Sequence, residues 1–291
     1  MAVPSPGLAK SGTVRTNGSA QALAVPKPSS SIRAVISLFE QKSRTAATAR
    51  VLVSAVSVVV LWQFLSVFVT NRLIMVPPAE VAKALLHEAA SGAMWTNAVA
   101  TGIAVGSSFL VSVAIGVIVG LCLASSRALS LTAGPLLAAL NSVPVIALAP
   151  LFIAWLGLGF ASKFVLVLLV AVFPVVVTTE TGLRATDRQL IEAARSFNAT
   201  SMQVFSTVTF PFALPFIVSG IRVAWARALV GIIVAEFFGS FAGFGFAIMS
   251  ASQTFDTARV LAYVILLGTM GLLGSVLFES LEQRLAPWRH E

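Results

Sequence analysis

Charged side chains are scarce in this chain. Of its 291 residues, 10% are Asp, Glu, Lys or Arg, whereas 57% are hydrophobic. Soluble domains carry roughly 25% charged residues, so this chain has too few of them to cover a surface that faces water. The composition argues against a soluble enzyme, a secreted domain and a nucleic-acid-binding domain, and it predicts a protein embedded in lipid. The net charge of +8 does not change this, because the basic residues are scattered.

Cysteine and histidine are also rare. The single cysteine, Cys122, cannot form an internal disulfide, and His87 and His290 are far apart in the sequence. These residues offer no metal-ligand spacing, so we expect no metal site. The chain also lacks the G-x-x-x-x-G-K-S/T pattern that holds nucleotide phosphates. We therefore expect no cofactor and no catalysis on this chain.

Long apolar runs occupy most of the chain after residue 50. A helix needs about 20 apolar residues to cross the hydrocarbon, and within one span only a helix satisfies all of its own backbone polar groups. The sequence predicts an all-α polytopic membrane protein with six transmembrane helices in residues 51–285. Their approximate ranges are 51–70, 98–124, 134–157, 162–181, 213–238 and 260–281.

The first 50 residues differ from the rest in composition. Residues 1–31 are rich in Pro, Ser, Gly and Ala and contain no acidic residue, so we expect a disordered tail. This tail is not expected to be a signal peptide, because the first apolar stretch begins near residue 50 and has the length of a full span. Residues 32–50 are predicted to form a cytoplasmic, basic, amphipathic segment.

The distribution of Lys and Arg predicts the orientation. If the N-terminus is inside, the segments on the cytoplasmic side of the six spans hold the larger share of these residues. We therefore expect both termini in the cytoplasm, residues 182–211 on the cytoplasmic side and residues 71–95 outside.

The longest polar interruption between predicted spans is residues 182–211. Two Thr-x-x-Gln pairs in it match the capping box that begins a helix, and they are Thr186 with Gln189 and Thr200 with Gln203. Asn198, between the pairs, tolerates the left-handed conformation that ends many helices, and Pro211 suits the first turn of the next span. The pattern predicts a helix, a tight turn and a second helix ending at Pro211. Such a loop either binds a protein partner or rests on its own bundle or on the lipid surface.

Seven residues of this loop follow a recognisable spacing: Glu-Ala-Ala, three residues, Asn, nine residues, Val, one residue, Phe and Pro. They are Glu192, Ala193, Ala194, Asn198, Val208, Phe210 and Pro211. The spacing resembles that of the EAA loop of ABC importer permeases, with Asn198 where Gly is usual and Phe210 where Leu is usual. Residues 73–85, 141–159 and 219–239 extend the resemblance, and they resemble the branch that imports nitrate, taurine, alkanesulfonates, bicarbonate or thiamine precursors.

The resemblance implies a type I ABC importer permease in the bacterial cytoplasmic (inner) membrane. It implies a homodimer that works with two ATPase subunits and an external solute-binding protein, with ATP and Mg²⁺ bound to the ATPase. The seven loop residues would then couple the permease to the ATPase. The expected cargo is a small anion such as nitrate, a sulfonate or bicarbonate. The alternative is an ABC permease that imports a thiamine precursor, and a less favoured alternative is a secondary transporter.

Glu192 has a second interpretation beside an ATPase contact. Arg188 and Arg195 lie four residues before it and three residues after it, so they share its face of the helix and can pair with it. Exposed pairs of this kind contribute only about 0–1 kcal/mol to stability.

The third predicted span contains Pro144 and Pro150, and each is expected to remove a helix hydrogen bond and to kink the chain. Interrupted helices at membrane depth often border a substrate path. Asn141, Ser142 and Pro144 are therefore candidates to line that path, although ordinary bundle packing would also explain them.

Arg227 falls near the middle of the fifth predicted span, where an ionisable side chain is a functional candidate. Glu236 lies nine residues further along and on the opposite helix face, so the two cannot neutralise each other. Arg227 either binds an anionic cargo through its fork of N–H donors or bonds to carbonyls of a neighbouring helix.

Glycine pairs spaced four residues apart occur in the second predicted span, at Gly102/Gly106 and Gly116/Gly120. Such pairs let helix backbones approach closely, so we expect tight helix packing at these positions.

Overall fold

The computed structural model describes residues 53–54, 56–68 and 75–285, and these residues form helices and turns with no strand. The predicted tail 1–31 and the basic segment 32–50 lie outside the described residues. The chain divides into two units, Met1–Val58 and Val59–Glu291. The fold described below is that of the second unit.

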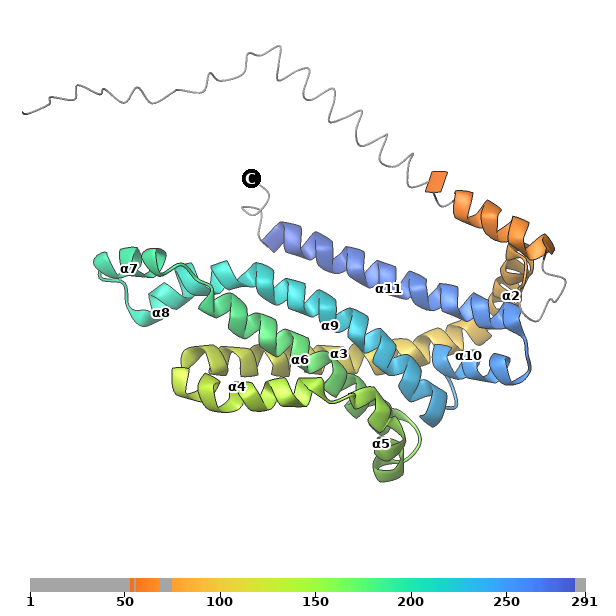
Figure 1. Cartoon of the computed structure of the whole chain (residues 1–291), viewed down its shortest axis with the longest axis horizontal. Helices are drawn as coiled ribbons and strands as arrows, with labels where there is room; N and C mark the ends of the chain where they lie inside the picture. The colour runs from red at the N-terminus through yellow and green to blue at the C-terminus, as the bar shows by residue number, and fades with distance from the viewer. Residues whose placement is uncertain (1–52, 55, 69–74, 286–291) are drawn as a thin grey trace, which may run out of the picture. The chain divides into compact units, whose positions relative to one another are not determined.

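Four helices in the described residues are long and apolar enough to cross a membrane. They are α3 (Ala93–Ser125), α6 (Phe160–Arg184), α9 (Phe210–Gly239) and α11 (Thr257–Leu285). In Figure 1 they run lengthwise, with α7 (Arg188–Ser196) and α8 (Ser201–Val204) near one end and α2 (Pro78–Ala90) and α10 (Phe244–Gln253) near the other. We call the α7–α8 end the inner end and the α2–α10 end the outer end, following the predicted orientation.

The predicted all-helical membrane fold is confirmed, whereas the count of six spans stays a prediction. The second, fourth, fifth and sixth predicted spans correspond to α3, α6, α9 and α11. In the first predicted span, 51–70, the described residues contain an apolar helix, Val56–Phe68. The cytoplasmic position of the two termini also stays a prediction, because both termini lie outside the described residues.

The third predicted span is a bent pair of helices. It consists of α4 (Arg127–Ser142), a short 3₁₀ turn (Val145–Leu148) and α5 (Ala149–Leu156), with an angle of 68° at the break. The break at Pro144 confirms the kink predicted there. The kink predicted at Pro150 is wrong, because Pro150 lies in the first turn of α5, where a helix N–H has no intrahelical partner to lose.

Helix α6 packs between α3 and α9, and these three helices share one buried apolar cluster. Its members include Val105, Phe109, Val167, Ala171, Val175, Ala228 and Ile232. The predicted close packing is confirmed for Gly116 and Gly120, because a Cβ at Gly120 would lie 2.6 Å from Cβ of Thr179 on α6. It is wrong within this chain for Gly102 and Gly106, where an added Cβ would meet no atom within 4 Å.

Candidate functional site

The inner loop begins with α7, an exposed helix that is capped one residue later than predicted. The side chain of Asp187 accepts a hydrogen bond from the Gln189 N–H at 2.8 Å and so caps the helix. Thr186, the predicted cap, is buried and donates instead to the Leu183 carbonyl at 3.0 Å. A carboxylate also suits this position because it faces the positive end of the helix dipole.

The turn after α7 has the predicted left-handed residue. Asn198 has a φ of 59°, its N–H donates to the Arg195 carbonyl at 2.9 Å, and the Ala199 N–H donates to the Ala194 carbonyl at 3.3 Å. The second predicted capping box is also confirmed, because Thr200 and Gln203 exchange side-chain and backbone hydrogen bonds. Local sequence signals therefore place the end of α7 and the start of α8 correctly.

The sequence predicted that the second helix of the loop ends at Pro211, and this prediction is wrong. The helix continues from α8 through a π-helical turn (Phe205–Thr209) into α9, which makes one helix over Ser201–Gly239. The Phe210 N–H donates to the Phe205 carbonyl, five residues back. A proline inside a regular α-helix clashes with the carbonyl four residues before it, and the wider π turn places Pro211 in the first turn of α9 without that clash.

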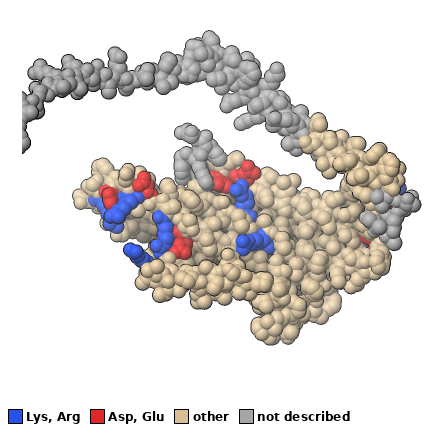
Figure 2. All heavy atoms as spheres, in the orientation of Figure 1, with Lys and Arg blue, Asp and Glu red and all other residues tan. Residues whose placement is uncertain are grey.

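Glu192 pairs with Arg188 on the surface of α7. The Arg188 Nε donates to the Glu192 Oε1 at 2.8 Å, and the two side chains are 90% and 62% exposed. Ala193 and Asn198 are exposed as well, whereas Val208, Phe210 and Pro211 are half-buried where the loop joins α9. Large apolar side chains at Leu190, Phe197 and Met202 are also exposed. On the face shown in Figure 2, charged side chains gather over the half that holds α7 and α8.

A cavity of about 480 Å³ lies between the bent pair, α6 and α9. Asn141, Pro144 and Arg227 all line it, and the Arg227 Nη1 donates to the Asn141 Oδ1 at 3.3 Å. Ser142 is not a lining residue, and its hydroxyl donates to the Ala138 carbonyl of its own helix at 2.9 Å. The remaining walls are apolar, formed by Val143, Val145, Ile146, Leu169, Val170, Phe173, Val223, Ala226 and Val230.

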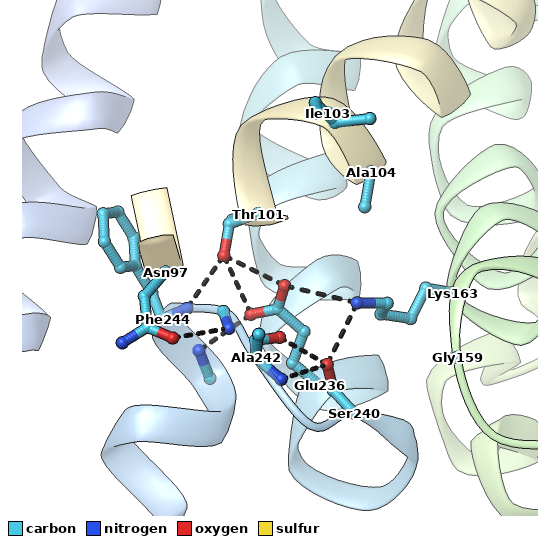
Figure 3. Close-up of polar contacts among 12 residues, drawn as sticks. Asn97, Thr101, Ile103, Ala104, Gly159, Lys163, Glu236, Ser240, Ala242 and Phe244 are labelled. Atoms are coloured by element: carbon cyan, nitrogen blue, oxygen red, sulfur yellow. Dashed lines mark hydrogen bonds and ion pairs between the residues drawn. The ribbon is translucent and has the colours of Figure 1, made fainter. Parts of the chain in front are cut away.

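Near the outer end, Figure 3 shows a cluster of polar side chains from three helices. We call it the outer polar bridge, and its side chains are those of Asn97 and Thr101 on α3, Lys163 on α6, Glu236 on α9, and Ser240 directly after α9. Glu236 is 1% exposed, and its carboxylate accepts hydrogen bonds from the Thr101 hydroxyl at 2.9 and 3.0 Å. The Lys163 Nζ lies 3.9 Å from the Glu236 Oε1 and donates to the Ser240 Oγ at 3.0 Å.

Sequence reasoning did not find this bridge. It named Glu236 only as too far along the helix to neutralise Arg227, and it gave Lys163 no role, but the structure buries both side chains and brings them together. One signal was available: Asn97 and Thr101 lie four residues apart, on one face of a mostly apolar helix. In the described residues, no group of three or more His, Cys, Asp or Glu side chains could hold a metal ion.

Comparison with known proteins identifies the family. Residues 112–287, more than half of the chain, match the family described as "Binding-protein-dependent transport system inner membrane component". The chain belongs to this family. It is therefore a multi-pass component of the inner membrane, in a family of transport-system components and not of enzymes.

Several relatives in this family are transport permease proteins. The chain is 40% identical to the aliphatic sulfonates permease protein SsuC of Bacillus subtilis over 52% of this chain and 55% of that protein. It is 36% identical to the formylaminopyrimidine permease protein ThiX of Halalkalibacterium halodurans, over 52% and 60%. These two matches thus span just over half of each relative. The SsuC protein of Escherichia coli is 34% identical over 80% of this chain and 89% of its own length.

The fold of this family member also matches a solved structure. A chain of the MetNI methionine ABC transporter, in inward facing conformations, aligns with a TM-score of 0.55 and 20% identity. The alignment covers 66% of this chain and 97% of that one. At this identity the similarity shows only that the two chains share a fold.

Proposed function

We propose that this chain is the permease subunit of an ATP-driven importer, which passes a small anionic solute from an external binding protein into the cytoplasm. Two copies would work with two ATPase subunits, and ATP and Mg²⁺ would bind to those subunits. The main structural support is that one helix, Ser201–Gly239, leads directly from the exposed inner loop to the cavity that Arg227 lines.

The inner loop is proposed as the contact with the ATPase. Its helix α7 presents charged and apolar side chains together on an exposed surface, including Glu192, Leu190 and Phe197. Phe197 is 86% exposed directly before the left-handed Asn198, and an exposed aromatic side chain of this kind is typical of an interface anchor. Glu192, Ala193, Ala194 and Asn198 form this contact surface, while Val208, Phe210 and Pro211 join it to α9.

The proposed cargo follows from the chemistry of the cavity. Among the described residues that line it, Arg227 alone is charged, and Asn141 orients the guanidinium through its side-chain carbonyl oxygen. A guanidinium presents several N–H donors to the oxygens of a carboxylate, sulfonate or similar oxyanion. The apolar walls suit an aliphatic body, so a small organic anion such as a sulfonate fits better than a bare inorganic ion. The two SsuC relatives are named for aliphatic sulfonates.

A pyrimidine-type thiamine precursor is the second candidate cargo, because ThiX is named for formylaminopyrimidine. The apolar walls, which include Phe173, would accept a ring, but a neutral ring does not require the Arg227 charge. The two candidates therefore differ in what they predict for Arg227.

Uptake into proteoliposomes with the ATPase and the binding protein tests the cargo. Arg227→Gln should assemble normally and abolish uptake of an alkanesulfonate. Arg227→Lys should retain part of the uptake, because lysine keeps the positive charge but lacks the planar set of N–H donors of the guanidinium. Arg222→Gln, on the same helix but outside the cavity, is the matched control. Unchanged sulfonate uptake by Arg227→Gln would reject the anion proposal, and uptake of formylaminopyrimidine by that variant would support the alternative.

Co-purification of the ATPase tests the proposed coupling contact. Glu192→Lys should insert into the membrane normally but bind less ATPase, because the substitution reverses the charge on the exposed face of α7. Glu80→Lys, a charge reversal at the outer end, should leave ATPase binding unchanged. If Glu192→Lys and deletion of residues 192–198 both retained wild-type ATPase binding and uptake, the coupling assignment would be wrong.

A further inference from the structure

The outer polar bridge connects parts of the chain that lie far apart in sequence. Glu236 on α9 contacts Thr101 on α3 and Lys163 on α6, and its Oε2 accepts the Gly245 N–H of α10 at 2.8 Å (Figure 3). Its buried members include one acid and one base, so their charges balance. The bridge therefore joins the three core helices and α10 at one place.

The first backbone amides of α10 depend on this bridge for their hydrogen bonds. The Gly243 N–H donates to the Asn97 Oδ1 at 2.9 Å, and the Phe244 N–H donates to the Thr101 Oγ1 at 2.8 Å. The Gly245 N–H donates to Glu236, so the amides of three consecutive residues, 243–245, are hydrogen-bonded to side chains from α3 and α9. These amides have no partner within their own helix, so the side chains of the bridge fix the start of α10.

Helix α10 has ten residues, too few to cross the hydrocarbon, so its position depends on what holds it. The contact with Glu236 is direct, since a Cβ at Gly245 would lie 2.7 Å from the Glu236 Cβ, and a Cβ at Gly243 would collide with the carboxylate. Glycine at both positions therefore lets the Glu236 side chain pack against the α10 backbone.

Opening the bridge would be unfavourable. Separating Glu236 from its partners would leave a buried carboxylate and a buried ammonium without their compensating contacts, which is strongly destabilising. The exposed pair of Arg188 and Glu192 at the inner end has no such constraint, because water can replace either partner.

We propose that the outer polar bridge stays closed throughout transport, with Glu236 as the positioning residue that makes α10 move together with α9. This inference rests on the proposed function, because it assumes a cycle driven through the inner loop. Helix α9 is unbroken from Phe210 to Gly239, so a displacement at its inner end is carried through the bridge to α10 at the outer end.

Hydrogen exchange of residues 240–250, measured by mass spectrometry on the full chain with its ATPase in nanodiscs, tests this proposal. In the wild type, this segment should exchange equally slowly in the resting state and in the ATP–vanadate-trapped state. Loss of its protection on trapping would overturn the proposal, because the bridge would then open during the cycle. Glu236→Ala should speed exchange at the start of α10 roughly tenfold, the effect of losing about one hydrogen bond, and unchanged exchange would also overturn it.

Two further variants separate a local effect from misfolding. Thr101→Val removes the acceptor of the Phe244 N–H but leaves both charges in place, so it should also speed exchange in α10. It therefore tests the bridge even if Glu236→Ala fails to assemble. Thr96→Val, five residues earlier on α3, should have no effect, because the Thr96 hydroxyl donates locally to the carbonyl of Gly92, the N-cap of the same helix. Slow exchange in Thr101→Val would contradict the anchoring role. The exchange of residues 188–198 tests the proposed function separately. If trapping with ATP and vanadate does not alter their exchange, the ATP-driven cycle is rejected. The exchange of α10 in the Glu236→Ala and Thr101→Val variants, measured in the resting state, still tests the role of the bridge.

Discussion

Polar contacts join the core helices at both ends, but those at the outer end are buried, whereas the Arg184–Glu180 pair at the inner end is partly exposed. Toward the inner end, α3 and α6 approach closely because Gly120 leaves room for Thr179, and α9 approaches α6 because Gly220 leaves room for Thr178. The outer end relies on buried polar contacts, centred on Glu236. The inner loop itself is attached through turns and through α9, and its Arg188–Glu192 pair is exposed.

This difference limits how far each end can rearrange. A buried polar network permits few arrangements, because each alternative leaves a polar group unsatisfied. An exposed loop with surface charges and apolar side chains can accept a partner with little rearrangement of its own chain. The buried outer bridge therefore permits fewer rearrangements than the exposed inner loop.

The largest expected effect concerns which end faces which side of the membrane. In a Cys122→Ala background, cysteines at Ser196 and Ala90 should react with an impermeant reagent from opposite sides, Ser196 from the cytoplasm and Ala90 from outside. Both positions are exposed in the chain, so access should depend on the side alone. Labelling of both from the same side would break the inner and outer assignment.

The next largest effect compares the loss of stability when one acidic residue is removed at each end of the core helices. Glu236→Ala should lower the free energy of unfolding by about 3–5 kcal/mol, because Lys163 loses its buried partner, whereas Glu192→Ala should change it by about 0–1 kcal/mol. Thermal unfolding of detergent-purified protein gives both values. The double variant Lys163→Met/Glu236→Leu should be more stable than Glu236→Ala; if it is less stable, the ion pair does not explain the loss.

A smaller effect distinguishes the two glycine pairs of α3. Gly120→Ala should destabilise the protein by about 1–3 kcal/mol, because the new methyl group overlaps Thr179. Gly106→Ala should cause no loss, since no atom lies within 4 Å of the added Cβ and Ala favours a helix by up to about 1 kcal/mol over Gly. The same unfolding assay compares them, and an equal loss in both variants would contradict close packing as the cause.

Short-range features of the fold were predictable from sequence, whereas the outer bridge was not. The break at Pro144, the left-handed Asn198 and the Thr200 cap each depend on one residue and its immediate neighbours. Arg227 was recognised because a charge within an apolar span is conspicuous, but its contact with Asn141, 86 residues away, was not. Thr101, Lys163 and Glu236 come from three different helices, and only the packing of those helices brings them together.

The π turn at Phe205–Thr209 also sets the direction in which the inner loop faces. A π turn contains one residue more than the corresponding α turn, and each residue of an α-helix rotates the chain by about 100° and advances it by about 1.5 Å. Shortening this turn by one residue would keep every residue of α7 but rotate α7 around the axis of α9 by about 100°. Two chains with the same loop sequence would then direct that loop to different sides of α9, so the length of this turn sets the direction of the loop independently of the loop composition.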